Sequence, residues 1–257
     1  MRFHLLNHIS SERFLSLVVL NEFRAYTIAE RTREPPWGVT ANICVRARDS
    51  RIRFDLSYPK SGGGEDLDFC ARARKHGPIK SVPGARADHP WWNDGKLKAV
   101  LHILTWAEGE VLCVGKSHMR EHVFWTFPNG VEMVVLTSIL THTRHGVFSG
   151  FSKSFISSLF ILTIELLWHA SRIKDHRLRS PVKESLLRAT IVRLTAAALI
   201  ILQEFMRMFQ ALDHNWGWVL WRMDWHFGLM PHLVTNRKWN NFIRALIYVL
   251  VCYFINL

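Results

Sequence analysis

The chain has 257 residues, of which 49% are hydrophobic and only 21% are charged, and it contains 11 tryptophans. This composition is unlike that of a disordered chain and favours a protein that contacts lipid. The formal net charge of +12 suggests an anionic partner, such as phospholipid headgroups or a phosphate-bearing substrate. Nucleic acid is disfavoured as a partner, because the basic residues are scattered and no recognised binding motif occurs.

The first part of the chain predicts an N-terminal helical segment, residues 1–36, followed by an α/β domain, residues 37–130. Apolar residues recur at roughly helical spacing before Pro35-Pro36, which ends the helix. Residues 43–45 are apolar, partly β-branched and short enough for a buried strand. Residues 79–82 alternate like a second short strand, which Pro83-Gly84 closes.

Between these two predicted strands lie three glycines, Gly62-Gly63-Gly64, followed by Glu65, Asp66 and Asp68. Acidic residues in a first helical turn are favoured by the helix dipole, and Gly77-Pro78 marks the helix end. A capped surface helix and a turn that carries a general base both fit this pattern. Asp66 and Asp68 stand at i and i+2, diverging by about 200° on a helix, so we do not expect both to grip one ion.

The remainder of the chain predicts a membrane region, residues 131–257, with about three hydrophobic helices. The sequence also predicts an amphipathic helix at 97–106, before this region. The apolar stretches are residues 147–170, 186–212 and 242–257. About 20 apolar residues cross a hydrocarbon layer of about 30 Å, and three such stretches behind a charged domain favour a multi-pass membrane protein.

The topology of this region is open at the sequence level. The segment 172–183 is short and basic, which favours the cytoplasm. A single helix before it would place it across the membrane from the acidic turn. Either residues 131–140 also enter the membrane as a hairpin with the next segment, or the first segment lies in the interface.

An ordered set of motifs over about residues 37–95 resembles the acceptor half of family 2 glycosyltransferases. The motifs are Ala41-Asn42-Ile43-Cys44-Val45-Arg46, Phe54-Asp55, the stretch from Gly64 to Gly77, Val82-Pro83 and Asp88-His89. This resemblance implies a GT-A domain of the α/β class. It also implies a nucleotide-sugar donor and inversion at the anomeric carbon.

The resemblance also assigns roles to single residues. Asp66 aligns with the aspartate that deprotonates the acceptor hydroxyl, and Glu65 is the neighbouring acid of the same motif. His89 is similar to a late histidine that contacts the metal or diphosphate in some GT-A enzymes. The implied acceptor- or substrate-binding residues are Asn42, Gly63, Gly64, Asp68, Arg72, Trp91 and Trp92.

Plainer interpretations of three of these assignments stay open. Arg72 fits a surface ion pair equally well, and a lone loop histidine such as His89 is more often structural than a ligand. Trp91 and Trp92 fit a packed aromatic pair as well as a platform for a sugar ring.

Two family features are absent from the sequence. The donor half, with its uracil-binding acids and D-x-D metal ligands, is expected before residue 37, where the sequence has no aspartate. The processive-polymerase signature Q-x-x-R-W is absent as well. The divalent cation that the resemblance implies, Mn²⁺ or Mg²⁺, therefore lacks its main ligands.

The predicted function is membrane-bound transfer of a sugar from a nucleotide-sugar to a hydroxyl of a lipid or glycan. We expect the chain to be an incomplete transferase, or the partner of a separate donor half or other transferase subunit, and to be weak or inactive alone. We expect its catalytic part on the cytosolic face. The alternative is a non-catalytic membrane scaffold or partner subunit derived from a glycosyltransferase.

Overall fold

A computed structural model describes residues 34–35, 37–38, 43–45, 52–60, 62–82, 96–172, 186–213, 222–225 and 231–256. The chain divides into two compact units. Unit 1 comprises Met1–Phe124 and Asp224–Met230, and unit 2 comprises Trp125–Met223 and Pro231–Leu257. The predicted helix before Pro35 lies outside the described residues.

Unit 1 is built around three helical elements, α3 (Glu65–Arg74), α4 (Lys96–Gly115) and the 3₁₀ helix η3 (Ser117–His122). They pack against one another around an apolar core. The core residues are Trp37, Tyr58, Leu67, Phe69, Cys70, Ala71, Cys113 and Met119. Helix α4 contains the predicted helix at 97–106 and extends nine residues beyond it, to Gly115.

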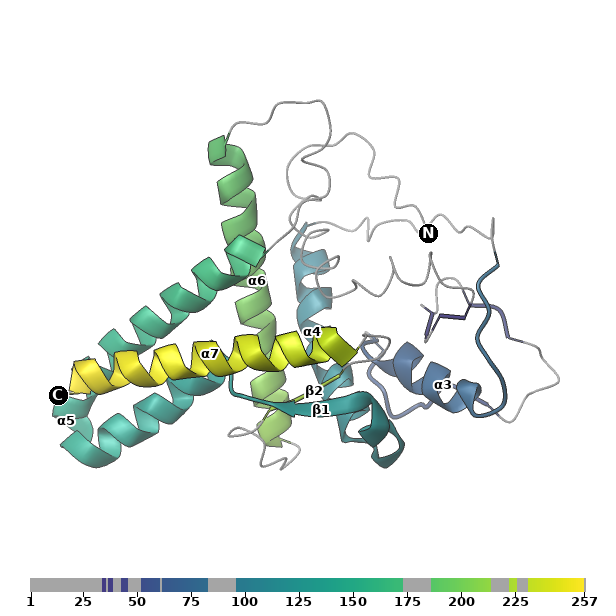
Figure 1. Ribbon diagram of the computed structural model, residues 1–257, viewed down its shortest axis with the longest axis horizontal. Coiled ribbons are helices and arrows are strands. Elements are labelled where there is room, and N and C mark those ends of the chain that lie inside the picture. The colour runs from purple at the N-terminus through teal and green to yellow at the C-terminus, as the bar shows by residue number, and fades with distance from the viewer. Residues whose placement is uncertain are drawn as a thin grey trace. The chain divides into compact units, whose positions relative to one another are not determined.

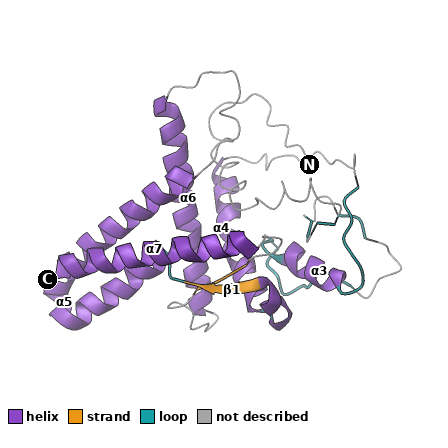
Figure 2. Cartoon of the chain, viewed as in Figure 1, coloured by secondary structure: helices purple, strands orange, loops and turns teal. Residues whose placement is uncertain are grey.

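The expectation of an α/β, GT-A-like domain is wrong for the described part of the chain, which is mostly helical (Figure 2). Neither 43–45 nor 79–82 forms a strand. The strands among the described residues are β1 (Val123–Thr126) and β2 (Arg222–Trp225), which pair with each other. A strand needs a partner for its backbone groups and a surface to pack on. Ile43 packs against the core of unit 1, but the 43–45 segment pairs with no strand among the described residues, and Val45 is exposed.

Unit 2 consists mainly of three long helices, α5 (Gly130–Arg172), α6 (Leu186–Asp213) and α7 (Pro231–Asn256) (Figure 1). Helix α5 packs against both of the others. Its start is fixed by a capping box. Asn129 Oδ1 accepts hydrogen bonds from the Val131 and Glu132 amides, and the Glu132 carboxylate accepts one from the Asn129 amide at 2.7 Å.

Helix α5 is a hairpin of two arms, residues 130–145 and 147–172, which we call the α5 hairpin. Gly146 has φ 73° and ψ 176°, a backbone conformation that is essentially restricted to glycine and breaks the helix. Beyond it the chain folds back on itself. Ser154 Oγ donates to Ser138 Oγ at 2.8 Å, and a Cβ on Gly130 would lie 3.0 Å from Glu165 Cβ. Small residues therefore let the two arms approach closely.

Unit 2 buries many polar residues beneath an exposed apolar surface, together with an apolar core of Met133, Ile161 and Tyr248. The α5 hairpin buries mostly small and polar residues: Gly130, Glu132, Thr137, Thr141, Gly150, Ser154, Ser157 and Glu165. Its exposed large apolar residues are Ile139, Leu140, Val147, Phe148, Phe151, Phe155, Ile156, Leu159, Phe160 and Leu167.

The other two helices of unit 2 also bury polar residues and expose apolar ones. Helix α6 buries Gln203 and Arg207 and exposes Leu202 and Phe209, among other apolar residues. Its buried apolar residues are Ala196, Ala197, Ile200, Met208 and Ala211. The polar residues that α7 buries are Asn241 and Arg244. Its exposed large apolar residues are Trp239, Phe242, Ile243, Leu246, Val249, Leu250, Tyr253 and Phe254.

Two helices of unit 2 are long and apolar enough to cross a membrane, namely α5 and the Ala189–Asp213 part of α6. The predicted apolar stretches at 147–170 and 186–212 lie within these helices. The third predicted stretch, 242–257, falls largely in α7, which is not among the candidate spans of the described chain.

Candidate functional site

The three glycines form a loop that lies directly against α4. All three have φ values in the left-handed region, 81° for Gly62, 105° for Gly63 and 81° for Gly64, which other residues rarely adopt. A Cβ on Gly63 would lie 2.8 Å from Trp106 Cα, and one on Gly64 would lie 2.7 Å from Cys113 Cβ. Glycine is therefore required here both by conformation and by space.

The same close approach makes Gly109 of α4 sensitive to substitution. A Cβ at Gly109 would overlap the Gly63 backbone, so we expect Gly109→Ala to push the loop away and destabilise α3 by about 2–3 kcal/mol. Hydrogen exchange of the α3 amides measures this loss as faster local opening.

The control for this prediction is Gly77→Ala, just after α3. A Cβ at Gly77 would meet nothing within 4 Å, so protection of α3 should change little. Equal protection in both variants would show that the glycine loop does not rest on α4.

The loop places Glu65 and Asp66 in the first turn of α3, where their predicted helix begins. Both side chains are half-buried, and the Leu67 amide donates to Asp66 Oδ1 at 2.9 Å. Burial lowers the pKa of His102 on α4 below its ordinary value, while the charge of Glu65 opposes that shift. Asp66 is thus a carboxylate on a fixed element with part of its surface open, which is what a general base needs.

Asp68, two residues further on, occupies a different environment. Its side chain is 0% exposed, and it pairs with Arg72 Nη2 at 3.1 Å, with Lys116 Nζ at 3.6 Å and with His118 Nε2. Asp68 therefore anchors α3 to the end of α4 and to η3. This geometry favours an anchoring role for Asp68 over the predicted binding role, and an ion pair for Arg72.

Lys116 links the same anchor to the loop 52–60. It donates to Asp55 and lies 4.2 Å from the centre of the Tyr58 ring. The hydrogen bond from Lys116, with one from the Ser57 amide, holds the pKa of Asp55 well below its ordinary range. Burial raises the pKa of Tyr58 well above its ordinary value. Sequence reasoning missed Lys116 and His118, because Lys116 lies 61 residues from Asp55, His118 lies 50 residues from Asp68, and neither carries a motif.

The remaining predicted site residues, Asn42, His89, Trp91 and Trp92, lie outside the described residues. Within the described part of the chain, no group of three or more histidine, cysteine or acidic side chains could hold a metal ion. Asp68 is already surrounded by cationic groups. The described residues therefore do not fit the divalent cation that the resemblance implies.

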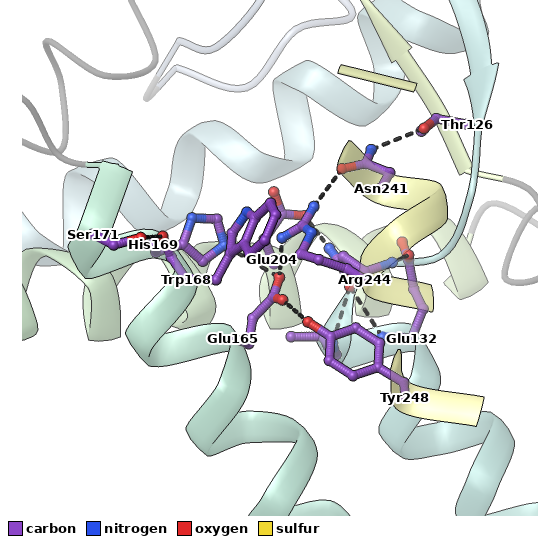
Figure 3. A network of polar contacts seen from close by, with 12 residues as sticks. Thr126, Glu132, Glu165, Trp168, His169, Ser171, Glu204, Asn241, Arg244 and Tyr248 are labelled. Carbon is purple, nitrogen blue, oxygen red and sulfur yellow. Dashed lines mark hydrogen bonds and ion pairs between the residues drawn. The ribbon is translucent and has the colours of Figure 1, made fainter. Parts of the chain in front are cut away.

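Unit 2 contains a buried polar network centred on Glu165 of α5 (Figure 3). Arg244 Nη1 of α7 donates to Glu165 Oε1 at 2.8 Å, Tyr248 donates to the other carboxylate oxygen, and His169 Nε2 lies 3.2 Å from Oε1. Arg244 also donates to Asn241. Glu165 and Arg244 form an ion pair at the centre of this cluster, and its main effect is to join α7 to the α5 hairpin.

The cysteines of unit 1 differ in burial, and we therefore expect them to differ in their reaction with a maleimide. Burial raises the pKa of Cys70 to about 11 and that of Cys113 to about 12, whereas Cys44 is exposed. At pH 7.5 we expect a maleimide to modify Cys44 and to leave Cys70 and Cys113 unmodified until the chain is unfolded.

The same pKa shifts predict a loss of stability in alkali. Above the ordinary thiol pKa of 9.0 the unfolded chain releases these protons before the folded chain does, so stability falls as the pH rises towards 11–12. Measuring the free energy of unfolding as a function of pH tests this predicted loss of stability. Rapid labelling of Cys70 or Cys113 in the folded protein would contradict the burial.

Comparison with family models, curated proteins and solved structures finds no match to this chain.

Proposed function

We propose that the protein is a membrane-bound contributor to sugar transfer, with Asp66 as the base that accepts the proton of an acceptor hydroxyl. The observation that carries this proposal is the geometry of the acidic turn. Three glycines with positive φ lie on α4 and hold Glu65 and Asp66 at the start of α3. The resemblance of this turn to the acceptor half of family 2 glycosyltransferases supplies the reaction class.

The chemistry of this step needs one proton acceptor within reach of the acceptor. Asp66 takes the hydroxyl proton while the oxygen forms its bond to the anomeric carbon, and the nucleoside diphosphate leaves with the electrons of the broken bond. The half-buried carboxylate is positioned by helix α3, which the buried Asp68 anchors. In this proposal a separate subunit binds the donor.

The buried polar groups and the exposed apolar surface of unit 2 support a location in the bilayer. Polar groups that are buried and paired, under an exposed apolar surface, are typical of helices whose solvent is lipid. The basic segment 172–183 favours the cytosol for the sequence next to it. We place the acidic turn on that face, where a lipid-linked or glycan acceptor at the membrane surface is within reach.

A depletion experiment tests this function. Source membranes are solubilised, the protein is removed with an antibody, and acceptor-dependent release of nucleoside diphosphate from nucleotide-sugars is measured. We expect the depleted extract to lose the activity and to regain it when purified wild-type protein is added. Unchanged release after depletion would contradict the proposal.

A non-catalytic membrane scaffold is the second candidate. It is favoured by the mostly helical fold that the described residues form in place of the predicted GT-A domain. The depletion experiment separates the two candidates. A scaffold would restore release equally well as wild type and as Asp66→Asn.

A further inference from the structure

The α5 hairpin also bears on how the chain enters the bilayer. We propose that it inserts from one side, so that residue 130 and residue 172 stay at the same membrane face while the tip around Gly146 lies away from it. This inference rests on the membrane location proposed above and is independent of the role of Asp66. The partner of the surface is the lipid bilayer itself.

The contacts between the arms show that the chain reverses its direction. A Cβ on Gly150 would lie 3.0 Å from His142 Cα, Ser138 bonds Ser154, and Gly130 faces Glu165. These pairs run in opposite order along the two arms, as in an antiparallel hairpin. A continuous helix of this length would instead extend roughly 64 Å at 1.5 Å per residue.

The outer surface of the hairpin fits hydrocarbon. Its interface holds glycine, serine and threonine, the small residues that let helices pack closely in membranes. Large apolar residues point outwards on both arms, and Phe148 near the tip is 96% exposed. In water such a surface would be costly, whereas acyl chains cover it without penalty.

The dimensions of the hairpin fit a bilayer. The shorter arm, 130–145, extends roughly 24 Å, close to the thickness of the hydrocarbon layer, about 30 Å. Arg144 and Lys153 flank the tip, and long basic side chains can reach headgroups from that depth. The charged network of Glu165, His169 and Arg244 lies at the open end of the hairpin, level with Gly130.

Helix α7 passes the same open end at Asn240 and Asn241. Asn241 donates to Thr126, just before the first arm, and Thr137 within that arm lies 3.2 Å from Cys252. Helix α7 therefore runs alongside the first arm from the open end towards the tip. A single membrane-crossing helix would place the basic segment 172–183 and the acidic turn on opposite sides of the membrane. With the hairpin, the chain before Gly130 and the chain after Arg172 lie on the same side.

Variants with one exposed reporter cysteine each test this topology in sealed vesicles whose cytosolic face is outward. The first reporter is native Cys44 in the Cys252→Ala variant. The other two are Ser171→Cys and Phe148→Cys, each combined with Cys44→Ser and Cys252→Ala. Cys70 and Cys113 are buried in every variant, and all three reporter positions are exposed.

We expect a membrane-impermeant maleimide to label Cys44 and the Ser171→Cys variant in intact vesicles, and to label the Phe148→Cys variant at least tenfold less until detergent is added. Labelling of Cys44 and the Ser171→Cys variant from opposite sides would overturn the proposal. Equal labelling of all three in intact vesicles would also overturn it. Transfer by the same vesicles with and without Asp66→Asn reports separately on the proposed function.

Discussion

Replacing Asp66 by asparagine is expected to lower acceptor-dependent sugar transfer by about 10²–10⁴-fold, because the amide cannot accept the proton of the hydroxyl. The change keeps an oxygen that can accept the hydrogen bond from the Leu67 amide. The fold should therefore be preserved, and hydrogen exchange of α3 should match the wild type. The measurement is the restoration of transfer in the depleted extract.

The matched control for this variant is Asp213→Asn, at the exposed end of α6. It removes the same charge from the chain and should restore transfer as well as the wild type. If Asp66→Asn restored sugar transfer fully, Asp66 would not be the base. Loss of α3 protection in Asp66→Asn would mean that the carboxylate is structural.

Replacing Asp68 by asparagine is expected to have the largest effect on stability. The buried carboxylate neutralises Arg72 and Lys116 and contacts His118, so its loss leaves cationic groups facing one another in a partly buried site. Removing one partner of a buried ion pair costs about 3–5 kcal/mol. We expect the amides of α3 and η3 to exchange faster, by the factor that corresponds to this loss of free energy.

Glu121→Gln serves as the control, because it removes an exposed carboxylate from the same 3₁₀ helix. It should change stability by less than about 0.5 kcal/mol. If the α3 amides were as well protected from hydrogen exchange in Asp68→Asn as in Glu121→Gln, the anchoring role of Asp68 would be refuted. Together with Asp66→Asn, this pair separates loss of chemistry from loss of structure.

The parts of the fold that were predictable are those with local causes. Three consecutive glycines followed by acids specify a loop and a helix start through backbone conformation and the helix dipole, and α3 begins at Glu65 as expected. Long apolar stretches indicated the positions of the second arm of α5 and of α6. Asn129 and Glu132 form a capping box that the sequence contained and the prediction overlooked.

The parts that were not predictable depend on tertiary contacts. A strand at 43–45 was expected from composition, but β structure needs a neighbouring strand, and the described chain supplies none. The pairing of Asp68 with His118 and that of Glu165 with Arg244 join residues far apart in the sequence. The acceptor-site roles of Asn42, Trp91 and Trp92 stay predictions, because these residues lie outside the described structure.

We expect unit 2 to lie in a bilayer, with its polar network inside and its apolar side chains against lipid. Extraction of source membranes with alkaline carbonate tests it most directly, since this treatment releases peripheral proteins and retains those that are embedded. The protein is predicted to remain in the membrane pellet and to require detergent for release. Recovery of the full-length chain in the carbonate supernatant would contradict the claim.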